Sequence, residues 1–189
     1  MHFKWRQTMT DCPWGSATPE LQIYHDQEWG KPQYDPQKLF ELLCLETYQA
    51  GLSWQTVLKK RTAFREDFLQ FDPQSVAKMT DADIERLMQD PRIIRNRLKL
   101  TDTVINARAL IELEAIEGFE TYLWSFVEGQ PIVNQPLTAS EVPAQSALSQ
   151  RISKDLKKRG FKFVGPTIIY SFLQGAGLIN DHLVGCSAK

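Results

Sequence analysis

The sequence predicts an all-α fold, and three observations carry that prediction. Apolar residues recur at helical spacing along most of the chain. Several segments begin at a capping residue and end at glycine or before proline, and no series of strands with strict alternation is present. The 189 residues are 42% hydrophobic and 24% charged. We therefore expect residues 1–189 to form one compact helical unit, built on a single core or as two closely packed lobes.

The individual helices are predicted from their end signals. Asp35 caps a helix with Pro36 at its first position and Gly51 just past its end. Thr80 and Asp83 resemble a capping box at the start of another helix. The full set of expected helices covers 35–51, 53–72, 80–90, 104–118, 122–127, 146–159 and 166–177. Residues 129–143 contain several prolines and should form the longest loop.

Charge and hydropathy exclude several classes of protein. The formal net charge of −1 gives no overall attraction to nucleic acid, so any DNA binding requires a local basic patch and oriented backbone amides. No apolar run approaches the roughly 20 residues of a membrane span, and the N-terminus lacks a secretory signal. We expect a cytoplasmic protein without a membrane partner.

Cysteine and histidine residues form two clusters near opposite ends of the chain. Cys12 and His25 lie near the N-terminus, and His182 and Cys186 lie one helical turn apart near the C-terminus. Together they would complete the Cys2His2 tetrahedron that zinc favours. Four protein ligands leave no position for water, so such a metal would be structural, and an open zinc hydrolase site would be excluded. The alternative is that all four are ordinary buried residues.

Glu46 is a carboxylate on the apolar side of a predicted helix, seven residues after Leu39 and three after Leu43. A buried carboxylate needs an ionic or hydrogen-bonding partner, which can be an arginine, backbone amides or a ligand. Aromatic residues stand nearby in the sequence or beside the candidate metal ligands, namely Trp14, Tyr24, Trp29 and Trp54. Rings beside a negative charge suit a flat cationic ligand, although each ring alone is more typical of a core than of a binding surface.

Residues 146–177 are predicted to form a helix, a hairpin and a second helix. Gly160 ends the first helix, and Gly165 precedes the second. Backbone amides at this turn can approach a phosphate, with Lys158 and Lys162 adding positive charge. The alternative is an ordinary solvated helix end. A second basic cluster could contact the other DNA strand or simply be exposed, and it comprises Arg92, Arg95, Arg97 and Lys99.

Several motifs together resemble the 3-methyladenine DNA glycosylase I (TAG) family of the helix-hairpin-helix DNA glycosylase superfamily. They are YHDQEWG at 24–30, LETYQAGLSW at 45–54, KRGFKFVG at 158–165 and NDH at 180–182. The similarity extends from about Cys12 to Cys186. It implies a structural zinc on Cys12, His25, His182 and Cys186, and a base pocket formed by Glu46, Tyr24, Trp54 and Trp14. Leu21, Thr47 and Tyr48 depart from the family pattern, which bears on the shape of the pocket.

The resemblance implies base excision repair. The enzyme would flip 3-methyladenine out of double-stranded DNA and hydrolyse its N-glycosidic bond, releasing the free base and leaving an abasic site. Glu46 would accept hydrogen bonds from the base edge, and Trp54 and Tyr24 would stack on its faces. Leu52 is a candidate wedge for the gap in the duplex, or else a core residue. Asp181 is a poor substitute for the catalytic aspartate of superfamily relatives.

Two further expectations concern alternatives and assembly. The chain could instead be a non-catalytic protein that binds alkylated DNA or another planar cation. We expect it to act as a monomer, and the sequence leaves open whether 3-methylguanine is also accepted.

Overall fold

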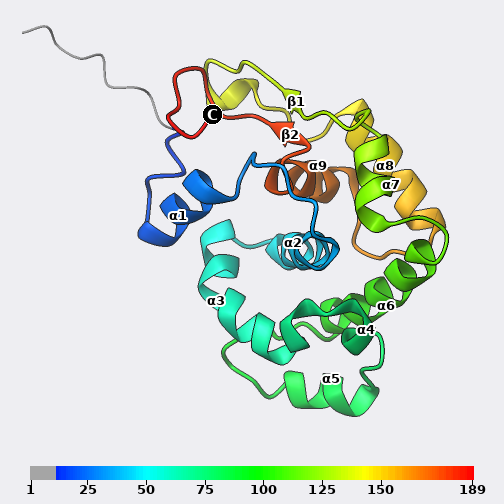
Figure 1. The fold of residues 1–189 in the computed structure, drawn as a ribbon. Helices are drawn as coiled ribbons and strands as arrows, with labels where there is room; N and C mark the ends of the chain where they lie inside the picture. Colours follow the sequence, from blue (N-terminus) through cyan, green and yellow to red (C-terminus); the bar gives the residue numbers. More distant parts are fainter. Residues whose placement is uncertain (1–11) are drawn as a thin grey trace, which may run out of the picture.

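The computed structural model describes residues 12–189, and these residues are mostly helical (Figure 1). The longer helices are α1 (Pro19–Gln27), α2 (Pro36–Gln49), α3 (Trp54–Asp67), α6 (Arg97–Glu114), α8 (Ala147–Lys158) and α9 (Pro166–Gly175). The shorter elements are η1 (Leu69–Phe71), α4 (Pro73–Val76), α5 (Asp81–Leu87), α7 (Phe119–Ser125), β1 (Ile132–Val133), η2 (Ala139–Glu141) and β2 (Ile179–Asn180). Within residues 12–189, no helix is long and apolar enough to cross a bilayer.

Helix α2 occupies the middle of the fold, with α9 and α3 packed against it (Figure 1). The side chain of Asp35 accepts hydrogen bonds from the amides of Gln37 and Lys38, and Pro36 follows at the first helical position. Gly51, with φ of +83°, begins the connection to α3 just after the end of α2, in a conformation that favours glycine. Because most of α2 is buried, a polar side chain on this helix must meet either a partner or a cavity.

The capping signals place α5 and α8 as predicted. Thr80 and Asp83 form the capping box at the start of α5, and Ser146 and Ser149 form another at the start of α8. Each box satisfies amides that the first helical turn leaves without a partner. The predicted ends of α5 and α8 lie within three residues of the observed ones.

The helix predicted over 53–72 is too long, and the structure corrects it. Helix α3 ends at Asp67, and the following residues Leu69 and Phe71 adopt positive φ values of 54° and 56°. The irregular turn lets Phe68 and Phe71 both be fully buried and stack with ring centroids 5.5 Å apart. The burial of Phe68 and Phe71 in the core thus ends α3 before Pro73, where the sequence pattern predicted the helix to end.

The loop predicted over 129–143 contains elements that the sequence did not reveal. Strand β1 pairs in parallel with β2, in the register Ile132 to Ile179 and Val133 to Asn180. Each strand has only two residues, too few for an alternating pattern to show. Helix α1 was likewise not predicted from the sequence. The pairing holds the 129–143 segment against the residues that lead into His182.

Candidate functional site

Glu46 lies on the buried face of α2, as its spacing predicts. The side chain is 3% exposed, and no hydrogen bond or ion pair to Glu46 is found among the described residues. Its Oε2 atom is buried without any partner. Burial raises the pKa of the carboxyl group to about 8. Neither an arginine nor a backbone amide within residues 12–189 is therefore the partner of Glu46.

Aromatic side chains surround this carboxyl group. The rings of Tyr24, from α1, and Trp54, from the first turn of α3, have centroids 5.2 Å apart at an interplanar angle of 57°. Trp14 lies on the other side of Tyr24, at 6.3 Å. The Tyr24 hydroxyl and the Trp54 Nε1 atom are both buried without a partner. Burial raises the pKa of the Tyr24 phenol well above its ordinary value, so the group remains a hydrogen-bond donor.

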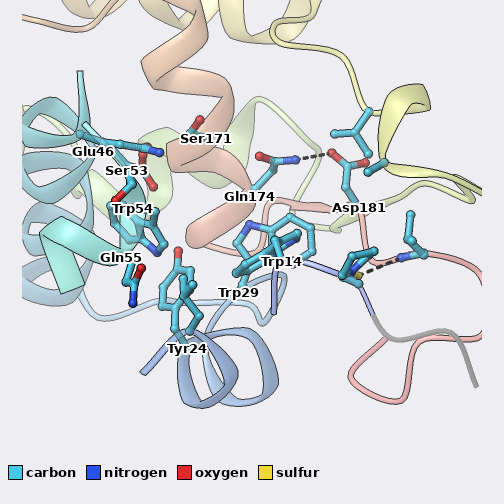
Figure 2. Close-up of a pocket in the computed structure, with 17 residues that line it drawn as sticks. Trp14, Tyr24, Trp29, Glu46, Ser53, Trp54, Gln55, Ser171, Gln174 and Asp181 are labelled. Carbon is cyan, nitrogen blue, oxygen red and sulfur yellow. Dashed lines mark hydrogen bonds between the residues drawn. The ribbon is translucent and has the colours of Figure 1, made fainter. Parts of the chain in front are cut away.

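A cavity of about 500 Å³ opens between these residues (Figure 2). This volume lies within the range of about 300–1,000 Å³ that is typical of small-molecule sites. Glu46, Tyr24, Trp54 and Trp14 all line it, so the structure brings together the four residues that the resemblance implied. The remaining polar side chains on the wall are Gln49, Ser53, Gln55, Ser171, Gln174 and Asp181.

The three residues that depart from the family pattern differ in whether they line the cavity. Leu21 lines the cavity, so this substitution does change its surface. Thr47 and Tyr48 do not line it. Tyr48 is fully buried in the core, and its hydroxyl lies 3.0 Å from Thr103 Oγ1. Tyr48 therefore forms no part of the cavity surface.

Gly175 allows helix α9 to approach the carboxylate closely. A Cβ atom at this position would stand 2.8 Å from the Tyr24 hydroxyl and 3.8 Å from Glu46 Oε1. The first distance is shorter than real Cβ contacts allow. The absence of a side chain thus keeps the space beside Tyr24 and Glu46 open.

The four candidate metal ligands meet at one buried point. Their donor atoms all lie within 4.8 Å of one another. Cys186 Sγ is 3.4 Å from His182 Nδ1 and 3.5 Å from His25 Nε2, and Cys12 Sγ is 3.7 Å from His182 Nδ1. Tetrahedral zinc with ordinary bond lengths separates sulfur and nitrogen ligands by about 3.6 Å. The distances match a tetrahedral Cys2His2 site.

Both histidines are held in the orientation that a metal ligand needs. His25 Nδ1 lies 2.7 Å from Oδ1 of Asp26, and His182 Nε2 lies 2.9 Å from the carbonyl oxygen of Trp29. In each ring the outward nitrogen donates its proton, so the inward nitrogen presents a lone pair. Burial lowers the pKa of His182 to about 4, which keeps the ring neutral. These residues fit a zinc ion, whose contribution would be to cross-link the two ends of the described chain.

The hairpin is present, but its amides are not all free. Gly160 adopts φ of +91° after α8, and α9 begins at Pro166. The amide of Lys162 donates to Asn106 Oδ1 at 2.7 Å, while Asn106 Nδ2 donates to the Lys162 carbonyl at 3.1 Å. The Gly160 amide bonds to Lys157 O. These two amides are therefore unavailable to phosphate, which corrects that part of the prediction.

Other groups of the hairpin do remain available. The amides of Gly165, Thr167 and Ile168 have no acceptor within residues 12–189, as expected for the first turn of a helix. The side chains of Lys158 and Lys162 are exposed. An anion at the start of α9 would thus meet oriented amides with positive charge nearby.

The second basic cluster is mostly committed to contacts within the protein. Lys99 is 6% exposed, and its Nζ donates to the carbonyl of Ala50 at 3.0 Å, beyond the C-terminal end of α2. Arg92 pairs with Asp90 and Glu66, and Arg97 pairs with Glu85. Leu52, by contrast, is 43% exposed in the turn between α2 and α3, so its alternative as a core residue is wrong.

Sequence reasoning missed several polar residues of the cavity wall, among them Gln49 and Gln174. Gln49 lies three residues after Glu46 on the same helix, a spacing that could have identified it. Gln174, in the last turn of α9, gave no such signal because its place depends on how α9 packs against α2.

Comparisons with known proteins agree with this geometry. The family model described as methyladenine glycosylase matches residues 14–189. The DNA-3-methyladenine glycosylase 1 of Escherichia coli (strain K12) is 55% identical over 179 residues, covering 94% of this chain and 96% of that protein. The DNA-3-methyladenine glycosylase of Haemophilus influenzae is 51% identical, with 95% and 98% covered.

Solved structures show the same likeness. A crystal structure of a 3-methyladenine DNA glycosylase I superimposes with a TM-score of 0.91 at 50% identity, covering 94% of this chain and 98% of that one. A Staphylococcus aureus enzyme, studied for its recognition of 3-methyladenine, gives a TM-score of 0.92 at 44% identity, with 96% and 97% covered.

Proposed function

The chain belongs to the methyladenine glycosylase family and is a glycosylase that acts on 3-methyladenine, and we propose that the Glu46 cavity is where it holds the base. The observation that carries the proposal is a buried carboxylate without a protein partner, walled by aromatic rings. The alternative of a non-catalytic binding protein has no specific observation in its favour.

The charge of the lesion explains why such a cavity discriminates. Methylation at N3 makes adenine in DNA positively charged, and a cation beside Glu46 favours the ionised carboxylate that burial otherwise disfavours. Stacking of the cationic ring on Tyr24 and Trp54 would add about 0.5–2 kcal/mol by cation–π attraction. Undamaged adenine lacks the charge and is a poor leaving group. Selection thus operates at binding and again at bond cleavage.

The charge also weakens the bond to the sugar, so the protein has less activation to supply. In our proposal Glu46 accepts hydrogen bonds from the edge of the flipped base, and water attacks the sugar carbon. Tyr24 and Trp54 hold the base, and Trp14 lines the same cavity next to Tyr24. Flipping costs a few kcal/mol and costs least for a damaged base.

We propose that the chain binds double-stranded DNA as a monomer, through two structural features. The amides at the start of α9 would hold a phosphate, with Lys158 and Lys162 adding charge, while Gly160 and Gly165 shape the turn. Leu52 would enter the duplex beside the flipped base, since it is exposed and its neighbours Ser53 and Trp54 line the cavity.

We also propose one structural zinc ion per chain, held by Cys12, His25, His182 and Cys186. Support comes from the ligand distances and from the partners that orient each histidine. The ion would cross-link α1 to the C-terminal segment and would take no part in cleavage.

Release of free 3-methyladenine from methylated DNA is the measurement that tests the role of Glu46. Glu46→Ala should lower the rate of release by at least about a hundredfold, the usual scale for removing a group that contacts the reacting base. The matched control is Glu112→Ala, which removes an exposed glutamate of α6. Unchanged release by a folded Glu46→Ala protein would remove Glu46 from the mechanism.

A further inference from the structure

Asp181 is a buried carboxylate that the proposed mechanism does not use. It is 2% exposed, follows β2 and precedes His182. Its Oδ2 atom accepts hydrogen bonds from the Tyr170 hydroxyl and from Gln174 Nε2, both at 2.7 Å. Its Oδ1 atom accepts one from Asn134 Nδ2 at 2.6 Å. Both carboxylate oxygens are thereby held in place.

These contacts fix which way the amide of Gln174 faces. A carboxylate accepts hydrogen bonds and donates none, so the amide must turn its nitrogen toward Asp181. Its carbonyl oxygen, Oε1, lies in the same plane as the nitrogen and therefore points away from Asp181. Figure 2 shows Gln174 between Asp181 and the rest of the cavity, with its nitrogen bonded to Asp181 and its oxygen turned away. Within residues 12–189, no donor contacts that oxygen.

The oxygen of Gln174 belongs to the same cavity as Glu46. Both residues line it, and the neighbouring Gly175 brings the α9 backbone against Glu46 and Tyr24. The wall on this side of the cavity therefore presents hydrogen-bond acceptors from two helices, α2 and α9.

We propose that Asp181 is a positioning residue, which locks Gln174 with its carbonyl oxygen toward the ligand and so selects purines with an amino group at carbon 6 over purines with a carbonyl group there. This proposal rests on the proposed function, because it concerns the base that the cavity holds. It concerns the choice between adenine and guanine derivatives, for which charge alone gives no preference.

The physical basis is whether the group at carbon 6 of the purine donates or accepts a hydrogen bond. The adenine amino group donates, so it can satisfy the oxygen of Gln174 or of Glu46. The guanine carbonyl accepts, and opposite a second acceptor it gains no hydrogen bond and loses its own contact with water. If the Gln174 amide could turn over, it would present a donor, and the penalty against guanine would disappear.

The surroundings of Asp181 oppose such a turn. The three donors on the carboxylate come from two distant parts of the chain: Tyr170 and Gln174 from α9, and Asn134 from the residue after β1. The pairing of β1 with β2 holds Asn134 next to Asp181. Turning the amide would place a carbonyl oxygen against the carboxylate and leave a buried charge with one hydrogen bond fewer.

Binding of the free bases 3-methyladenine and 3-methylguanine, measured by calorimetry on the full chain, tests the proposal. The unmutated chain should bind 3-methyladenine more tightly. Gln174→Met keeps the length of the side chain but removes the acceptor, and Asp181→Ala keeps Gln174 but releases its amide. Each should reduce the ratio of the two affinities by about tenfold, the scale of one hydrogen bond.

Tyr170→Phe is the matched control, since it removes an equally short hydrogen bond to the same Asp181 oxygen without freeing Gln174. It should keep the affinity ratio. A purely structural role for Asp181 would instead weaken both bases equally in Asp181→Ala and leave the ratio unchanged, which overturns the proposal. An unchanged ratio in Gln174→Met overturns it too, and this variant decides the matter if Asp181→Ala does not fold.

Failure of the proposed function gives a different result. The unmutated chain could prefer free 3-methyladenine and yet not release it from methylated DNA. This result would refute the catalytic role but would not contradict the proposed selection by Gln174 and Asp181. A chain that binds neither base, or both equally, overturns the selectivity proposal.

Discussion

The buried carboxyl group of Glu46 should make the stability of the protein fall as the pH rises. The ordinary pKa of 4.5 applies in the unfolded chain, and burial raises it to about 8 in the folded one. Between these values the folded state keeps a proton that the unfolded state has lost. Stability attributable to this group is therefore fully present below pH 4.5, declines as the pH rises, and is lost above about pH 8.

The size of the effect follows from the shift. Each pKa unit corresponds to about 1.4 kcal/mol, so a shift from 4.5 to about 8 corresponds to a loss of order 5 kcal/mol. The side chain is only 3% exposed, so solvent screening gives little relief. Glu46→Gln, which cannot ionise, should therefore be about as stable as the unmutated protein near pH 5 and several kcal/mol more stable near pH 9.

Urea unfolding of both proteins between pH 5 and pH 9, with zinc saturating, measures the difference directly. Cysteine and histidine titrate in both proteins alike, so their contributions cancel in the difference. Glu112→Gln, on the exposed side of α6, should show a constant difference across the range. A Glu46→Gln difference that varies by less than about 1 kcal/mol from pH 5 to pH 9 would refute the reasoning, since it would mean no raised pKa.

Other perturbations test the remaining parts of the site. Cys186→Ser should lower the zinc content and the thermal midpoint together, measured by elemental analysis and circular dichroism, and an unmutated protein that contains no zinc would contradict the metal site. Gly175→Ala should reduce release of 3-methyladenine at least tenfold, because its methyl group would stand 2.8 Å from the Tyr24 hydroxyl; Gly118→Ala, 3.5 Å from its nearest neighbour, should not. Lys162→Ala should reduce the slope of log affinity for DNA against log salt by about one, and an unchanged slope would show that Lys162 meets no phosphate.

The sequence predicted those parts of the fold and site that depend on local signals. Asp35, Thr80 and Ser146 cap helices because their side chains reach amides only two or three residues ahead. The burial of Glu46 followed from helical spacing alone, since the whole buried face of α2 is set by its period. That Cys12 and His182 meet was an interpretation of residue types, which the structure supports with distance.

What the sequence could not predict depends on contacts between distant segments. The end of α3 at Asp67 is decided by where Phe68 and Phe71 find space in the core. Lys99 was predicted to belong to an exposed basic cluster. Its Nζ atom instead donates to the carbonyl of Ala50 at the end of α2, because α6 packs against α2. The orientation of Gln174 depends on Asp181, which follows β2 and also accepts a hydrogen bond from Asn134, the residue after β1.

The residues that line the Glu46 cavity range along the chain from Cys12 to Leu183. During translation, almost the entire described chain must therefore be synthesised before the wall of this cavity is complete. A product that stops before Asp181 and Leu183 would lack part of the cavity wall.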